Sequence, residues 1–158
     1  MRQYKSSYLL PGTLRIPGSI FLTAGLTLLI LRFYYGIKPE WLELPVFAVY
    51  SAYLDVKYMT VIQNQLVEEF GGLLLLAGLY MIAFSKEKNE TAFVNSLRLR
   101  AFIISMWINA AFLLLSMLFI YGIGYAVMMM MDIAFLLVVY IVSFKLLIYK
   151  NHKTGLIK

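Results

Sequence analysis

The sequence predicts an all-α membrane protein, in which four transmembrane helices form a single integral membrane domain over residues 1–158. A short external segment is expected between the first two helices. The chain is 62% hydrophobic and only 14% charged, whereas about 25% of the residues of a soluble domain are charged. Four apolar stretches of roughly 20 residues, the length that crosses a bilayer, divide the chain, and blocks of basic residues lie before, between and after them.

These basic blocks determine the predicted topology. They precede the first stretch, separate the second from the third and follow the fourth: Arg2, Lys5 and Arg15; Lys86, Lys88, Arg98 and Arg100; and Lys145, Lys150, Lys153 and Lys158. Short loops rich in Lys and Arg stay on the cytoplasmic side, so we expect both termini and the central loop in the cytoplasm. The net charge of +6 is explained by this arrangement, and we expect no binding of nucleic acid.

The first span is expected over residues 16–35. Pro17 suits the first turn of a helix, where its missing N–H costs little. Arg32 interrupts the far end of the span and is followed directly by aromatic residues. An arginine at that depth can extend its head to the interface beside an aromatic belt. We interpret Arg32 as an anchor, and the alternative is a functional intramembrane residue.

A fifth span over residues 44–65 is an alternative, because much of this stretch is apolar. Asp55 and Lys57 lie in its middle, and each such residue costs roughly 2.5 to 3.5 kcal/mol at a bilayer centre. A span here would also move the central basic loop to the outer side. We therefore assign residues 38–65 to an external segment.

The composition of the external segment favours a short β-hairpin. Residues 46–53 and 56–62 are rich in β-branched and aromatic types, and residues 54–56, with Asp55, can turn between them. The alternative is an amphipathic helix on the outer membrane surface, which would bury Phe47, Tyr50, Leu54 and Tyr58 among the lipid headgroups.

The second span is expected over residues 66–84, and a cytoplasmic loop over residues 85–100. Glu68 and Glu69 lie in the first turn of the span, where acids favour the positive end of the helix dipole. The centre of the loop can be helical, with Arg98 on its more exposed face. Its charged residues make this loop the candidate partner-binding segment: Lys86, Glu87, Lys88, Glu90, Arg98 and Arg100.

The third and fourth spans are expected over residues 101–121 and 126–149, as an antiparallel pair joined by a glycine-containing turn. Asp132 is the strongest single-residue candidate, because an acid inside a span is costly unless water, a cation or a hydrogen-bond donor faces it. It could gate protons or cations, or be bonded to a tyrosine or to Asn109 for structural reasons. The candidate intramembrane polar site therefore consists of Asp132, Asn109 and Arg32.

No recognisable catalytic set or motif occurs in the sequence. It contains no cysteine and a single histidine, His152 in the basic tail, which excludes thiol nucleophiles and cysteine zinc sites. Neither a phosphate-binding GxxxxGK[ST] motif nor an HExxH motif occurs. We expect no enzyme activity, cofactor or metal.

Several short segments carry a resemblance to a known group of proteins: Trp41-Leu42-Glu43, Tyr50-Ser51, Glu68-Glu69, Gly78, FSKEK at 84–88 and LRL at 97–99. With them the chain resembles small uncharacterised multi-span inner-membrane proteins of Bacteroidetes-type bacteria over most of its length. The resemblance implies a bacterial inner-membrane location. Some comparable proteins are encoded beside short helix-turn-helix regulators, which implies a signalling role. The chain departs from the group after the SKEK run, where more acid is expected.

Two hypotheses of function follow. The first is a non-enzymatic accessory or regulatory membrane protein, whose external segment or cytoplasmic loop binds a protein partner. The second is a small transporter or channel subunit, which would form a homo-oligomer because four short spans leave little room for a pathway within one copy.

Overall fold

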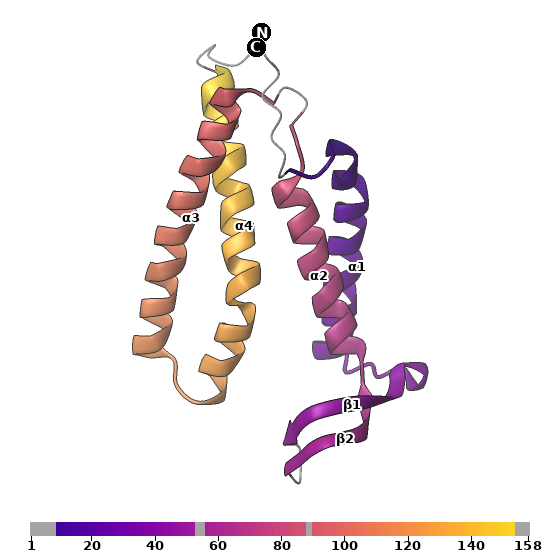
Figure 1. Cartoon of the computed structure of the whole chain (residues 1–158). Helices are drawn as coiled ribbons and strands as arrows, with labels where there is room; N and C mark the ends of the chain where they lie inside the picture. Colours follow the sequence, from indigo (N-terminus) through magenta and orange to yellow (C-terminus); the bar gives the residue numbers. More distant parts are fainter. Residues whose placement is uncertain (1–8, 53–55, 88–89, 154–158) are drawn as a thin grey trace. The chain divides into compact units, whose positions relative to one another are not determined.

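The computed structural model describes residues 9–52, 56–87 and 90–153. Within these residues four long helices and one two-stranded sheet follow each other in the order shown in Figure 1. They are α1 (Arg15–Phe33), β1 (Glu43–Ala52), β2 (Val56–Gln65), α2 (Val67–Phe84), α3 (Ala92–Phe119) and α4 (Ile123–Lys153). The predicted helices, with a β-hairpin between the first two, are confirmed. The turn expected around Asp55 and the basic residues Arg2, Lys5, Lys88 and Lys158 lie outside the described residues.

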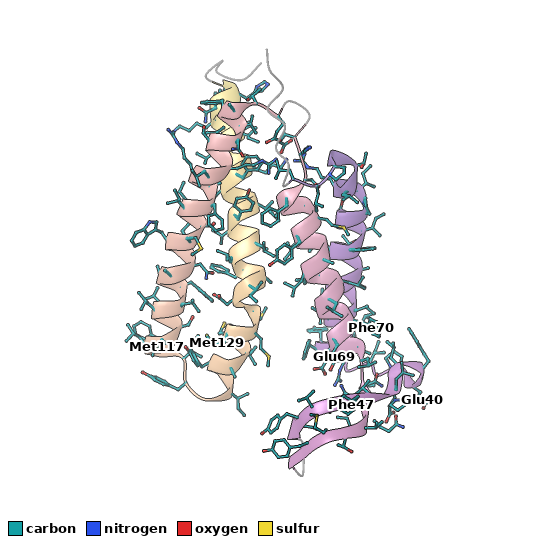
Figure 2. All side chains as sticks on the ribbon, in the orientation of Figure 1. Glu40, Phe47, Glu69, Phe70, Met117 and Met129 are labelled. Carbon is teal, nitrogen blue, oxygen red and sulfur yellow. The ribbon has the colours of Figure 1, made fainter. Side chains whose placement is uncertain are left out.

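All four helices are long and apolar enough to cross a membrane. Only 11% of the most apolar stretch of α1 and 28% of that of α2 is buried, so most of the apolar surface faces outward. Figure 2 shows side chains projecting all along the helices, with Met117 and Met129 labelled near the ends of α3 and α4. Both of these methionines are exposed. A soluble monomer rarely exposes apolar surface on this scale. The four apolar helices therefore indicate a multi-pass membrane protein.

The chain divides into two compact units. One unit contains the described residues up to Ile20 and those from Ala77 onward, and the other is Phe21–Leu76. In the first unit α3 and α4 lie side by side and run in opposite directions (Figure 1). Gly122 turns the chain between them with a φ of +67°, which glycine adopts without the penalty that a Cβ would bring.

The third helix begins at Ala92, earlier than the start near residue 101 that the sequence predicts. Thr91 is its N-cap, and the Thr91 side chain accepts a hydrogen bond from the backbone N–H of Val94. A threonine in this position satisfies one of the free donors of the first turn. Residues 92–100 are consequently helical.

Glycines bring α1 and α2 into close contact in both units. In the first unit a Cβ on Gly18 would lie 3.2 Å from the carbonyl oxygen of Gly78, and in the second a Cβ on Gly25 would lie 2.7 Å from that of Gly71. Small residues allow membrane helices to approach in this way. Gly18 and Gly25 are spaced by seven residues, as are Gly71 and Gly78. This equal spacing on both helices is a signal that we missed in the sequence.

The hairpin excludes both a fifth span and a surface helix over residues 44–65. β1 and β2 are antiparallel, with Val46 opposite Ile62 and Tyr50 opposite Tyr58. Their β-branched and aromatic residues suit a pleated surface. The hairpin is joined to its root by a hydrogen bond from the backbone N–H of Leu66 to the carbonyl oxygen of Leu42 at 3.0 Å.

Candidate functional site

A buried arginine is the centre of a charge cluster where α2 ends and α3 begins. Arg98 is only 6% exposed. Its Nε donates to Oε1 of Glu90 and its Nη2 to Oε2 of the same residue, each at 3.1 Å. An arginine and a carboxylate that are joined by two parallel hydrogen bonds in this way form one of the strong types of charged hydrogen-bond pair. The Glu90 side chain is 10% exposed, so the pair is shielded from water on both sides.

The same guanidinium group also binds the end of α2. Its Nη2 donates to the carbonyl oxygen of Ser85 at 2.9 Å, and its Nη1 to that of Ala83 at 3.4 Å. The last carbonyls of a helix have no partner within the helix, and a basic side chain can satisfy them. The plane of the guanidinium lies over the ring of Phe144 in α4, 4.4 Å from its centroid. Arg98 thus joins α2, α3 and α4.

Glu87 is the second acid of the cluster and pairs with two cations. Arg15, the first residue of α1, reaches its Oε1 at 2.6 Å and its Oε2 at 2.8 Å. Lys145 of α4 donates to Oε1 at 3.2 Å. Burial opposes ionisation of Glu87, but the hydrogen bonds and charges of Arg15 and Lys145 outweigh it, and the pKa of Glu87 is lowered. We call Arg15, Glu87, Glu90, Arg98 and Lys145 the arginine cluster.

This arrangement corrects the prediction that residues 85–100 form a loop with Arg98 on its more exposed face. Arg98, expected on the more exposed face, is buried, because its partners come from α2 and α4 as well as from Glu90. Glu87 and Glu90 form ion pairs with Arg15 and Arg98 of the same chain. Of the residues proposed for partner binding, Arg100 is exposed and Lys86 is partly exposed; Lys88 lies outside the described residues. The arginine cluster therefore has a structural role at the junction of the helices.

The candidate intramembrane site is a pair that bridges α3 and α4. Nδ2 of Asn109 donates to Oδ2 of Asp132 at 3.2 Å. Oδ1 of each residue is buried and has no hydrogen-bond partner within the described chain. The alternative in which Asn109 holds Asp132 in place for structural reasons agrees with this contact.

Arg32, the third residue of that candidate set, lies in the other unit, where it pairs with Glu68. Its Nε donates to Oε1 of Glu68 at 2.9 Å, and its Nη2 lies 2.7 Å from the same oxygen. Glu68 is in the first turn of α2, so the pair ties the last turn of α1 to the first turn of α2. The interpretation of Arg32 as an anchor at the membrane interface stays a prediction.

The hairpin has two different faces, because successive residues of a strand point to opposite sides. Nδ2 of Asn64 donates to Oε1 of Glu69 in the first turn of α2 at 2.8 Å, so the face that carries Asn64 is turned toward α2. This inner face consists of Leu44, Val46, Ala48, Tyr50, Tyr58, Thr60, Ile62 and Asn64. The outer face includes Pro45, Phe47, Val49, Val61 and Gln63.

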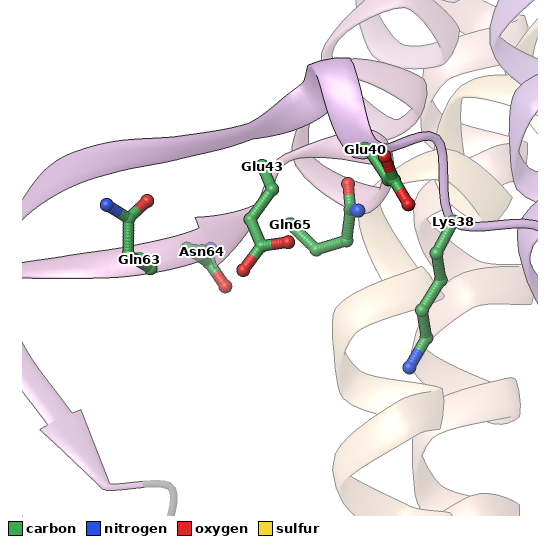
Figure 3. A pocket seen from close by; sticks show the side chains of 6 residues that line it. All are labelled: Lys38, Glu40, Glu43, Gln63, Asn64 and Gln65. Carbon is green, nitrogen blue, oxygen red and sulfur yellow. The ribbon is translucent and has the colours of Figure 1, made fainter.

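A polar hollow lies at the root of the hairpin. It has a volume of about 340 Å³ and is lined by the six residues of Figure 3, which are Lys38, Glu40, Glu43, Gln63, Asn64 and Gln65. The hollow is open to solvent, and no group of three or more His, Asp or Glu side chains that could hold a metal ion occurs among the residues that the structure describes.

Comparisons with known proteins give no independent indication of function. No protein-family model, curated protein or solved structure matches this chain.

Proposed function

We propose that this chain is a non-enzymatic accessory or regulatory protein of a bacterial inner membrane, which binds a protein partner through the outer face of its hairpin. Its termini and the arginine cluster lie on the cytoplasmic side in this proposal. Basic residues lie at the start of α1, from the end of α2 into α3 and in the second half of α4, whereas the hairpin follows the other end of α1, and positive charge stays inside. The hairpin then lies outside the cytoplasm.

The observation that carries the proposal is the apolar surface of the outer face. Phe47, Val49 and Val61 are 64%, 63% and 63% exposed. Phe47 and Val61 are directly opposite each other on the two strands, so their side chains form one continuous patch. Because this face is turned away from α2, it is also turned away from the bilayer that α2 would cross. Exposed apolar patches of this kind mark interaction sites.

The stability of the hairpin gives a second reason for a partner. An isolated two-stranded sheet is marginally stable in water, and a third strand or a packed surface is usually needed. Each strand here has ten residues, yet within the described chain the sheet contains β1 and β2 alone. A protein that covers Phe47 and Val61 would supply the missing support.

Site-specific photocrosslinking in the producing cells tests this proposal. A benzophenone side chain at Val61 should form an adduct with one discrete protein. The same group at Thr60 is the matched control, because Thr60 is the neighbouring residue on the inner face. Phe47→Ser should abolish the adduct from position 61, because it removes the opposite half of the apolar patch without a buried contact being lost.

Two results would contradict the proposal. Adducts formed with lipid alone would show that the outer face does not meet a protein. An adduct equally strong from positions 60 and 61 and insensitive to Phe47→Ser would show that the captured protein does not recognise the apolar patch.

A small oligomeric transporter or channel subunit is the second candidate function. The buried Asn109–Asp132 pair favours it, because each residue keeps one oxygen without a hydrogen-bond partner in the described chain and polar groups inside spans mark ion pathways. Ion flux into vesicles that contain the purified chain, compared with flux through the Asp132→Asn variant, tests this function. Flux that is absent, or that Asp132→Asn leaves unchanged, would remove its support.

A further inference from the structure

The inner face of the hairpin has the composition of a membrane-interface surface. Tyr50 and Tyr58 are 60% and 69% exposed, and their rings lie 5.5 Å apart across the two strands. A tyrosine has an apolar ring and a polar hydroxyl group, and both are satisfied where acyl chains meet lipid headgroups. Leu44 and Val46 continue the same face toward the root of the hairpin.

The short connections of the hairpin hold this face near the ends of α1 and α2. Nε2 of Gln65 donates to the carbonyl oxygen of Pro39 at 3.1 Å, and β2 is separated from α2 by Leu66 alone. A hollow of about 350 Å³ is lined by Tyr50 and Ile62 of the inner face and by Glu69 of α2. The inner face, Tyr50 included, is therefore directed toward the helix end and not into the solvent beyond it.

The direction of the strands extends this surface sideways. In Figure 1 β1 and β2 run across the axes of the neighbouring parts of α1 and α2, not along them. A strand of ten residues is roughly 33 Å long at about 3.3 Å per residue, whereas a helix with its side chains is about 10 to 12 Å wide. If α1 and α2 cross a bilayer, the hairpin reaches well beyond them along its surface.

We infer that the hairpin lies flat on the outer surface of the bilayer, with Tyr50 and Tyr58 among the lipid headgroups and the outer face presented to the aqueous side. The inference rests on the proposed crossing of the membrane by α1 and α2, but it does not require the protein partner. The occupant of the inner face is lipid, because that face is directed toward the end of α2, which lies at the membrane surface if α2 crosses the bilayer. Such a hairpin holds Phe47 and Val61 at a constant height above the membrane.

The absence of cysteine from the chain allows a direct test with single-cysteine variants. A nitroxide label is attached at Tyr50→Cys or Tyr58→Cys on the inner face, at Val49→Cys or Val61→Cys on the outer face, and at Leu73→Cys, an exposed position of α2. Each full-length variant is placed in vesicles of phosphatidylethanolamine and phosphatidylglycerol without other proteins. Collisions of the label with oxygen, which enters lipid, and with a nickel chelate, which stays in water, are then compared by electron paramagnetic resonance.

The ratio of oxygen to nickel collisions should be several-fold higher at positions 50 and 58 than at 49 and 61. Equal ratios on the two faces would overturn the inference. Protection of positions 50 and 58 from both reagents would also overturn it, because a protein surface would then cover them. A low ratio at position 73 would show that α2 is not in the bilayer, and the inference would fail together with the proposed membrane crossing.

Discussion

Replacement of Arg98 by alanine is expected to destabilise the protein strongly. The substitution removes both hydrogen bonds to Glu90, those to the carbonyl oxygens at the end of α2, and the contact with the ring of Phe144. It also leaves the Glu90 carboxylate, 10% exposed, without a cation. Breaking a buried ion pair by removing one partner costs about 3 to 5 kcal/mol, and we expect a loss in that range for Arg98→Ala.

The free energy of unfolding can be measured by titrating sodium dodecyl sulfate into the protein in mild detergent micelles, with helix content followed by circular dichroism. Arg100→Ala is the matched control, because Arg100 is a basic residue of the same helix and is exposed. An exposed substitution of this kind changes stability by about 0.5 kcal/mol or less. Arg98→Lys keeps the charge but not the two-point geometry, and should recover only part of the loss.

A double-mutant cycle separates the ion pair from the other contacts of Arg98. Glu90→Gln removes the charge that Arg98→Ala leaves uncompensated, so the double variant should lose less stability than the sum of the two single losses, by about 0.5 to 3 kcal/mol. Equal losses for Arg98→Ala and Arg100→Ala, or strict additivity in the cycle, would refute the role of Arg98 as the buried centre of the cluster.

Three further predictions concern other parts of the chain. Because the pKa of Glu87 is lowered, its ion pairs stabilise the protein fully above the ordinary carboxyl pKa of 4.5, and this stabilisation is lost as the pH falls through the lowered pKa. Glu87→Gln should therefore lower the thermal midpoint of unfolding at pH 7. A difference in midpoint between the two proteins that persists in strong acid would contradict this. Gly25→Ala should lower the free energy of unfolding by about 1 to 3 kcal/mol through overpacking, because the new Cβ would lie 2.5 Å from a backbone nitrogen of α2. The matched control is Gly72→Ala, whose new Cβ meets nothing within 4 Å and which should leave the free energy of unfolding unchanged in the same titration. Asn109→Val should lose about 0.6 to 2 kcal/mol as the hydrogen bond to Asp132 disappears, and an unchanged free energy of unfolding would show that this bond is not formed in the bilayer.

The features predicted correctly depend on local properties of the sequence. A stretch of about 20 apolar residues predicts a membrane helix without knowledge of its neighbours. The charges of Asp55 and Lys57 within an otherwise apolar stretch argued against a fifth span over residues 44–65, and the β-branched and aromatic residues of 46–53 and 56–62 favoured a hairpin. Even there, the sequence also allowed a surface helix, because the same side chains can form an apolar face with the repeat of a strand or with the repeat of a helix.

The features that the sequence did not reveal depend on contacts between distant residues. An arginine beside Leu97 and Leu99 looks exposed when residues 92–100 are considered alone. Its burial requires the carbonyl oxygen of Ser85 and the ring of Phe144, which lie in different helices. The bond between Asn109 and Asp132 was one of several alternatives for the same reason, since only the packing of α3 against α4 brings the two side chains together.

The ion pairs of Glu87 have a consequence for the assembly of the chain during synthesis. Arg15 is the first residue of α1 and Lys145 lies in the second half of α4, and both reach the carboxylate of Glu87, which follows α2. The three charges can meet only when the start of α1, the end of α2 and the end of α4 emerge on one side of the membrane. Arg15 can pair with Glu87 once α1 and α2 are in place, whereas Lys145 adds the second cation only after α4 has entered the membrane. A chain in which α1 or α4 is inserted in the opposite direction would leave Glu87 without one of its cations.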